Sequence, residues 1–290
     1  MKNIEIVCFG EVLWDNLKEG RRLGGAPLNV CYHLNKRGIP SAIVSQVGND
    51  SNGSDILNEI DQLEIDRTFC TVSESKPTST VEVHIIDEKV TYEIVEDVAW
   101  DHIPYTAELE NAVGGAEVLL FGSLVTRNSV SRNTLFRLLP AAKYKVFDVN
   151  MRPPFYTKDR IEALIKVSNL LKMNEEELFV LCDWWQIEVK EEERKLNTIL
   201  NQFESLEAII LTKGAEGASY CSRDIYLSAP AQKVQIADTV GSGDAFLASF
   251  LASKLQGIPV EEALKSAIVL SGFVATQAGA CPPYELAEIY

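Results

Sequence analysis

The sequence predicts an α/β fold in which a mostly parallel central sheet is flanked by helices on both faces. A chain of 290 residues that is 46% apolar and 24% charged has the proportions of a globular protein with a sizeable core. Short apolar runs alternate along it with amphipathic segments of helical period, which is typical of parallel strands joined by helices. Two regions interrupt this alternation and predict a second, small antiparallel sheet: one shows period-two polarity, and the other resembles a short pair of strands.

The elements of the main sheet follow one another in a regular order. Six short apolar runs are predicted as buried strands, at residues 4–9, 42–47, 118–121, 146–149, 170–173 and 208–211. Helical patterns lie between and after them, at residues 29–36, 54–63, 160–167, 191–203, 243–254 and 260–276. The last of these is rich in Ala, Ser and Gly, which suits close packing.

These regions cover residues 12–23 and 78–96, and each is predicted as a hairpin, with turns at Glu19-Gly20 and Glu88-Lys89; the period-two polarity lies in the second region. A few antiparallel strands cannot form an independent core. We therefore expect one domain over residues 1–290, with these strands inserted as a lid that projects from the α/β body. The apolar face of such a lid needs a cover, and a homodimer through the lid is one way to provide it.

Composition excludes several classes of protein. A net charge of −15 repels phosphate backbones and anionic lipids, so neither nucleic acid nor a membrane is an expected partner. The first residues lead directly into a strand-like run and do not resemble a signal peptide. The six cysteines form no CxxC motif, and several stand in apolar surroundings, which indicates buried free thiols in a cytoplasmic protein. Three widely separated histidines give no support for a catalytic triad or a zinc site.

The most informative segment is residues 237–246, which read ADTVGSGDAF. Gly241 and Gly243 stand directly before a helical pattern, so backbone N–H groups at the helix start can approach an anion closely. Asp244 stands at the same point, where an aspartate often serves only as an N-cap. The flanking glycines and a second acid, Asp238, favour a different role. A base there would take a hydroxyl proton while the N–H groups hold a phosphoryl group.

A second glycine pair, Gly24-Gly25, lies within residues 21–30, which read RRLGGAPLNV. Pro27 suits the first turn of a helix, and Asn29 is expected on its exposed start. The segment is either a plain strand–helix turn or a corner that binds hydroxyl groups, and the spacing alone does not decide between them. The chain contains no P-loop, no GxGxxG fingerprint and no protein-kinase signature.

Together, Gly24-Gly25-Ala26-Pro27-x-Asn29 and Asp238-Thr239-x-Gly241-x-Gly243-Asp244 resemble the two signatures of the ribokinase-like, or PfkB-type, carbohydrate kinases. Supporting segments occur in the family's order over nearly the whole chain: Phe9-Gly10-Glu11, Asp148-Val149-Asn150-Met151-Arg152-Pro153, Asn174-Glu175-Glu176-Glu177, the loop at residues 211–217, and Gly279-Ala280. The resemblance implies a ribokinase-like fold and the phosphorylation of a sugar hydroxyl that depends on ATP and Mg²⁺.

The resemblance also implies roles for individual residues. Asp244 resembles the catalytic base, and Gly241, Ser242 and Gly243 resemble the anion hole for the γ-phosphate. The set that resembles the family's sugar site is Asp15, Gly24, Gly25 and Asn29. The set that resembles its nucleotide site is Asn174, Thr212, Gly214, Gly217, Gly241 and Gly243.

Two metal roles are implied in the same way. Glu177, with Asn174, resembles the pair that organises magnesium and phosphate, through water. Acids at a helix start also complement the helix dipole, so capping is an equal interpretation of this pair. Asp238 and the backbone of Val240 resemble part of the monovalent-cation site, for K⁺, that many members have.

Three further candidates come from their own chemistry. Asn150 and Arg152 follow a predicted strand end, where Arg152 could hold a sugar hydroxyl or carboxylate, or pair with an acid of the body. Trp100 could stack on a sugar face or pack in the core under the lid.

The acceptor is expected to be D-fructose, with fructose 6-phosphate as the product. The Gly-Gly-Ala-Pro form, the opening GEVLWD and the phrase DVNMRPP are most similar to fructokinases. A 2-keto-3-deoxygluconate kinase shares the D-x-N-x-R phrase and stays open, as does a nucleoside or vitamin kinase of the same superfamily. A non-catalytic sugar or nucleotide sensor is the alternative from another class, and the complete catalytic set argues against it.

Overall fold

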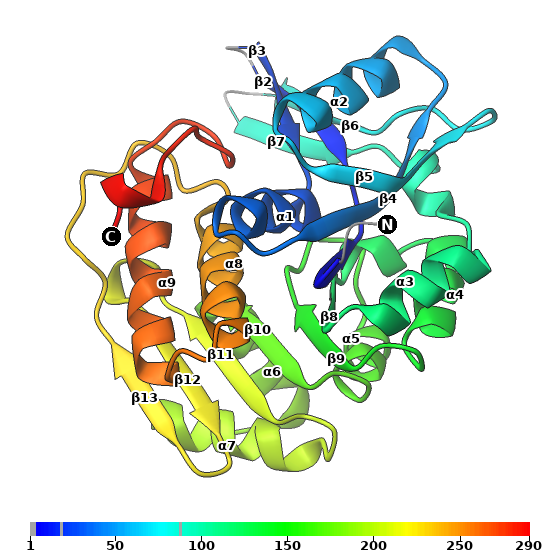
Figure 1. Ribbon diagram of the computed structural model, residues 1–290. Coiled ribbons are helices and arrows are strands. Elements are labelled where there is room, and N and C mark those ends of the chain that lie inside the picture. Colours follow the sequence, from blue (N-terminus) through cyan, green and yellow to red (C-terminus); the bar gives the residue numbers. More distant parts are fainter. Residues whose placement is uncertain (1–3, 18–19, 87–88) are drawn as a thin grey trace.

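Two sheets organise the part of the chain that the computed structural model describes, residues 4–17, 20–86 and 89–290 (Figure 1). The large sheet has the strand order β13-β12-β11-β10-β9-β8-β1-β4-β5. All pairs from β11 to β5 are parallel, while β12 and β13 extend one edge in antiparallel pairing. The mostly parallel α/β architecture predicted from the sequence is therefore confirmed. Its strands are β1 (Ile6–Phe9), β4 (Ser41–Gly48), β5 (Asp66–Ser73), β8 (Val118–Gly122), β9 (Tyr144–Asp148), β10 (Leu170–Asn174), β11 (Ala208–Thr212), β12 (Ala218–Ser222) and β13 (Tyr226–Ala229).

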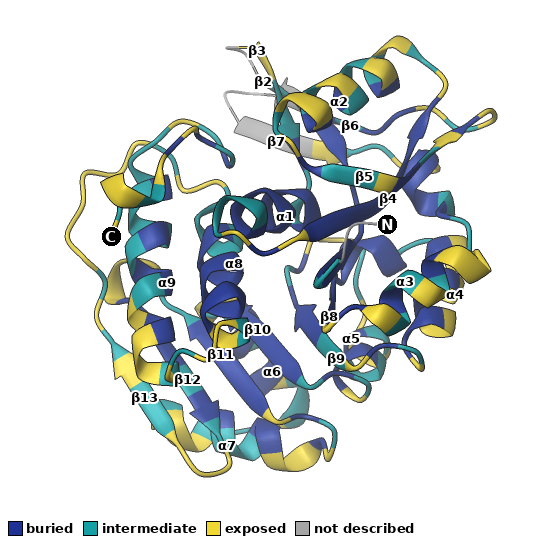
Figure 2. Ribbon diagram, in the orientation of Figure 1, coloured by how far each residue is buried: buried dark blue, intermediate teal, exposed yellow. Residues whose placement is uncertain are grey.

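Helices cover both faces of this sheet, because its strands are apolar on both sides. Ile6 and Cys8 of β1 belong to one core, and Val7 and Phe9 to the other. Figure 2 shows the central strands buried over most of their length. The helices of the first core are α1 (Ala26–Lys36), α2 (Ser51–Gln62), α8 (Ser242–Leu255) and α9 (Val260–Ala275). Those of the second are α3 (Ala107–Gly115), α4 (Ser129–Leu138), α5 (Lys158–Ile165), α6 (Glu175–Trp185) and α7 (Glu192–Gln202).

The small sheet has the order β3-β2-β6-β7 and lies at the top of Figure 1, beside α2. Its strands are β2 (Leu13–Leu17), β3 (Gly20–Gly24), β6 (Thr80–Ile86) and β7 (Lys89–Ile94). Both predicted hairpins are present, and a short parallel pairing of β2 with β6 joins them into one sheet. The predicted turn residues Glu19 and Glu88 lie outside the described residues.

The six predicted strands and six predicted helices all exist, within a few residues of their predicted ends. The sequence analysis did not identify β5, β12, β13, α3 or α4. All six cysteines are free thiols, and only Cys281 is partly exposed. In the described ranges no helix is both long enough and apolar enough to cross a bilayer.

A buried ion pair fixes the segment that leaves the small sheet. Arg127 donates Nε and Nη2 to the two carboxylate oxygens of Asp101, each at 2.8 Å, and both side chains are almost fully buried. The guanidinium also donates to the Val95 carbonyl oxygen and lies over the Trp100 ring, 4.0 Å from its centroid. Trp100 has no exposed surface. The expectation that it stacks on a sugar is therefore wrong for this structure, and core packing is what the structure shows.

We expect Asp101→Ala to lower the free energy of unfolding by about 3–5 kcal/mol, because it leaves Arg127 buried without its counter-charge. Urea unfolding followed by circular dichroism measures this. The matched control is Asp61→Ala, which removes the partner of Arg67 in an exposed pair of the same bidentate geometry and should cost less than about 1 kcal/mol. Equal losses in the two variants would contradict the role given to burial.

Candidate active site

The predicted site residues gather where parallel strands of the large sheet end. Ligands of open α/β sheets bind at the carboxyl ends of the strands. The register places Asp148, the last residue of β9, beside both Gly122 of β8 and Lys172 of β10. It also places Asn174 of β10 beside Thr212 of β11. One edge of the sheet thus carries polar side chains from three neighbouring strands, β9, β10 and β11.

The glycine-rich segment forms an open helix N-terminus above this edge. Gly241 is the N-cap of α8 with φ 77°, and a Cβ there would collide with Ala280. In the described part of the chain no side chain caps α8. Ser242 donates both its N–H and its hydroxyl to the Thr239 carbonyl oxygen, so its hydroxyl is engaged away from a ligand. The free first-turn donors are the N–H groups of Gly243 and Asp244.

Asp244 is not the N-cap. It is the third residue of α8, and its carboxylate Oδ2 accepts a hydrogen bond from Asn29 Nδ2 at 2.8 Å. Asn29 belongs to the first turns of α1, where Pro27 precedes it, and it is 5% exposed rather than on an open surface as expected. This hydrogen bond brings together the two glycine-rich segments, which are 215 residues apart in the chain.

A buried cation that the sequence analysis did not identify lies under this loop. Lys172 donates from Nζ to both carboxylate oxygens of Asp148, each at 3.0 Å. A Cβ built on Gly243 would stand 3.2 Å from the same Nζ. The signal was present in the sequence as a lysine inside the apolar run Leu170-Leu171-Lys172-Met173.

Burial raises the pKa of Asp244 to about 6, and Lys172 opposes that rise. Asp148 adds to the rise, whereas the Asn29 hydrogen bond and Arg152 act against it. A carboxyl with a pKa near 6 is mostly ionised at pH 7 and is still basic enough to take a proton, which suits a general base.

The acceptor-side candidates lie between the small sheet and this edge. A Cβ on Gly24 would collide with the Asp15 carboxylate, and a Cβ on Gly25, at φ 123°, would collide with the Glu11 carbonyl oxygen. Burial raises the pKa of Asp15, and the charge of Arg152 opposes it. Arg152 itself is exposed.

Two more residues belong to this side. Asn150, in the left-handed region at φ 38°, accepts a hydrogen bond at its carbonyl oxygen from Ser123. Glu11 is 3% exposed, and its Oε2 has no hydrogen-bond partner among the described residues. Glu11 was quoted in the sequence analysis but given no role.

The nucleotide-side candidates include a complete helix cap. Asn174 caps α6 by accepting from the Glu177 N–H, and Glu177 accepts in return from the Asn174 N–H, both at 2.9 Å. The other Glu177 oxygen accepts from the Met151 N–H at 2.8 Å. The capping interpretation of this pair is therefore confirmed. Gly214 and Gly217 have positive φ and close the turn after β11.

The predicted monovalent-cation residues lie beside α8. Asp238 accepts hydrogen bonds from the N–H groups of Val240 and Gly279, and from Arg22 of β3 at 3.2 Å. The contact with Arg22 links the small sheet to the loop before α8. Across the described ranges, no three His, Cys, Asp or Glu side chains are grouped so as to hold a metal by themselves.

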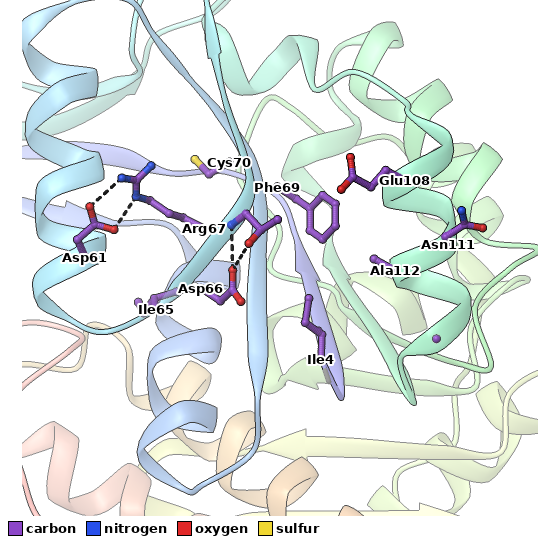
Figure 3. A pocket seen from close by; sticks show the side chains of 12 residues that line it. Ile4, Asp61, Ile65, Asp66, Arg67, Phe69, Cys70, Glu108, Asn111 and Ala112 are labelled. Carbon is purple, nitrogen blue, oxygen red and sulfur yellow. Dashed lines mark hydrogen bonds and ion pairs between the residues drawn. The ribbon is translucent and has the colours of Figure 1, made fainter. Parts of the chain in front are cut away.

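Two surface cavities lie away from this edge. One of about 930 Å³ is lined by the first half of β5, by Ile4 before β1 and by α3 (Figure 3). These are the amino ends of the strands, opposite the gathered site residues. The other, of about 560 Å³, lies between the ends of α6 and α7. Neither contains a residue of the predicted site.

An open helix start beside a partly buried carboxylate, at the carboxyl edge of an α/β sheet, is an arrangement that suits phosphoryl transfer. A family model described as pfkB family carbohydrate kinase matches residues 4–287. The chain belongs to this family of carbohydrate kinases.

Individual relatives agree with this assignment. A fructokinase from Rhizobium leguminosarum bv. trifolii is 29% identical over 266 residues, which cover 86% of this chain and 79% of that protein. The crystal structure of an uncharacterized sugar kinase from Pyrococcus horikoshii, in complex with ATP, is 25% identical with a TM-score of 0.81, over 98% of this chain and 96% of that one. A fructokinase from Xylella fastidiosa with bound ATP has the same fold, with a TM-score of 0.86 at 19% identity over 99% and 97% of the two chains.

We expect Gly243→Ala to fold normally but to lower kcat/KM for ATP by about 10- to 100-fold, because its methyl group enters the space next to Lys172 Nζ and displaces a phosphoryl group there. A coupled assay of ADP release measures this. The control is Gly272→Ala in α9, where a Cβ meets nothing closer than 3.8 Å, and this variant should keep full activity. A Gly243→Ala enzyme with unchanged kcat/KM would contradict the anion-binding role of this loop.

Proposed function

We propose that this kinase transfers the γ-phosphoryl group of ATP to a hydroxyl of a ketose, D-fructose, and forms fructose 6-phosphate. The observation that carries the proposal is the hydrogen bond of Asn29 to Asp244 beside the open start of α8. It supports the proposal because it holds the Asp244 carboxylate at the helix start that has the free N–H groups of Gly243 and Asp244. The charge of Arg152 acts on both Asp15 and Asp244, which supports an acceptor site on the same side. A hydroxyl and a phosphoryl group can meet there.

The chemistry needs one base and one anion site. The proton of the acceptor hydroxyl passes to the Asp244 carboxylate as the hydroxyl oxygen attacks the γ-phosphorus. The bond from that phosphorus to the β,γ-bridging oxygen breaks, and ADP leaves with the electron pair. The N–H groups of Gly243 and Asp244, at the positive end of the α8 dipole, stabilise the charge on the transferring group.

The nucleotide is proposed to lie along the ends of β10 and β11, against Asn174, Thr212, Gly214 and Gly217. Magnesium bound to its phosphates would supply charge neutralisation. Glu177 is proposed to act on such a metal through water, while its two oxygens accept backbone N–H groups that hold the carboxylate in place. The Asp238 carboxylate and the Val240 carbonyl are the proposed ligands of a potassium ion.

The acceptor is the finer part of the proposal. The name of the Rhizobium relative supports fructose. Arg152 supports the second candidate, 2-keto-3-deoxygluconate, because an exposed guanidinium at this edge could pair with a sugar carboxylate.

We expect Asp244→Asn to lower kcat by about two orders of magnitude or more, because the amide cannot accept the hydroxyl proton. The KM values for sugar and ATP should change much less. Steady-state kinetics on the purified variant measure this, and its circular dichroism and Tm should match those of the wild type. A folded Asp244→Asn enzyme with near-normal kcat would remove the base from the mechanism.

An acceptor panel tests the substrate. We expect kcat/KM for D-fructose to exceed that for D-ribose, 2-keto-3-deoxygluconate, a nucleoside and fructose 6-phosphate by about 10-fold or more, because a sugar site discriminates through its buried polar groups. ADP release gives the rates, and ³¹P NMR of the product identifies the phosphorylated hydroxyl. A higher value for another acceptor would replace fructose and leave the kinase chemistry intact. Absence of ADP release with every acceptor would favour the alternative that the protein is a non-catalytic sugar or nucleotide sensor.

A further inference from the structure

Lys172 is a charged residue at a buried position of a central strand, and it is 7% exposed. Its partner Asp148 is 3% exposed. Taking both charges out of water has a free-energy cost that offsets their attraction, so a buried pair of this kind is weak evidence of a stabilising role. Its place is informative, because Lys172 Nζ lies directly under the loop that presents Gly243 and Asp244.

Acids surround the lysine. Burial lowers the pKa of Lys172, but Asp148, Glu177 and Asp244 together outweigh burial and raise the pKa above its usual value. The lysine therefore stays a cation at every pH at which the enzyme would work. It is a fixed positive charge that faces three carboxylates from three different elements.

The geometry points to Lys172, fixed in place by Asp148, as a positioning residue that holds Asp244 in its ionised form. This inference rests on the proposed role of Asp244 as the base. Asp244 is partly buried, and burial favours the protonated form of a carboxyl. A nearby cation opposes this effect. A protonated Asp244 cannot take the proton of the acceptor.

The other groups that face Asp244 do not replace the lysine. Asn29 of α1 is neutral, and Cys281, after α9, is a thiol whose pKa is raised by burial. Glu11, after β1, and Asp148 of β9 are acids and disfavour a further negative charge. Arg152, after β9, is a cation, but it is exposed and therefore screened by solvent. Lys172 is the buried cation in this set.

The decisive experiment compares Lys172→Met with Lys172→Arg in the pH dependence of kcat/KM for the sugar at saturating MgATP. In the wild type the value should fall as pH drops through about 6, where Asp244 takes up a proton. Loss of the Lys172 charge close to Asp244 should move the acid limb of the profile to higher pH, by roughly one pH unit. Relative to the wild type, Lys172→Met should then lose about tenfold more at pH 5.5 than at pH 8.5.

Lys172→Arg keeps the charge, and its acid limb should stay within about 0.3 pH unit of the wild type. A purely structural role for Lys172 predicts a loss in Lys172→Met that is the same at every pH, and that result would overturn the inference. So would equal shifts in the Met and Arg variants.

Lys172→Gln supplies a second neutral variant if Lys172→Met does not fold. Its amide can still donate to Asp148 but carries no charge, so the acid limb should again lie above that of the wild type. An unmoved limb in Lys172→Gln would overturn the inference.

A readout without turnover completes the test. In protein labelled with ¹³C at aspartate carboxyl groups and free of ligands, the Asp244 signal is assigned by its absence in Asp244→Asn. Its titration midpoint should move up in Lys172→Met and stay in Lys172→Arg. If Asp244→Asn keeps its kcat, the proposed base fails. If that variant is inactive but the midpoint does not move in Lys172→Met, only the inference about Lys172 fails.

Discussion

The hydrogen bond between Asn29 and Asp244 is the contact on which the site depends, because it joins the starts of two helices from opposite ends of the chain. Those helices, α1 and α8, pack side by side in the same core. One turn further along α1, His33 hydrogen-bonds Tyr284 and the Ala280 carbonyl oxygen, each at 2.9 Å. Burial lowers the pKa of His33 to about 4, so the imidazole is neutral at pH 7. Ala280 in turn contacts Gly241, and α1 therefore supports both the carboxylate and the loop before it.

The charged side chains at the carboxyl edge of the large sheet act on one another as a cluster, not as separate ion pairs. Burial raises the pKa values of Glu11, Glu177 and Asp244 alike, since each carboxyl loses water on folding. Backbone N–H groups compensate Glu177, whereas one oxygen of Glu11 has no partner among the described residues. A sugar brings hydroxyl donors, and such an oxygen can accept from them. The three carboxyls therefore differ in their hydrogen bonding. Glu177 has a structural role, whereas Glu11 and Asp244 can still accept hydrogen bonds from a ligand.

The elements that could be predicted from the sequence are those whose apolar residues repeat regularly because they face the core. The strands buried on both faces and the large helices were found, because their apolar residues repeat. Strand β5 was not found, since it lies at the edge of the sheet and opens with the polar residues Asp66, Arg67 and Thr68. The hairpin of β12 and β13 is likewise at an edge and only partly buried.

The same limit applies to the site. The two glycine-rich segments were visible as local patterns, but their contact spans 215 residues and no local pattern contains it. Trp100 was placed at the sugar because its cover, Arg127, comes from a different part of the chain. Lys172 was overlooked because its neighbours read as a buried strand. A charge within such a run is itself a signal, since a buried lysine needs a partner, and Asp148 stands at the end of the next strand.

A protein with a net charge of −15 can hold a triphosphate only where local structure reverses its own field. Three features do this at the edge of the sheet. The open start of α8 offers N–H groups and the positive end of a helix dipole, Lys172 places a buried cation beneath them, and Arg152 adds a cation at the surface. Lys172 and Arg152 also oppose the rise in the pKa of Asp244, so the cations that we propose to attract the phosphates also favour the ionised form of the neighbouring carboxylate. In the proposed mechanism, anion binding and base function would therefore depend on the same positive charges, and the acids that surround Lys172 keep it charged.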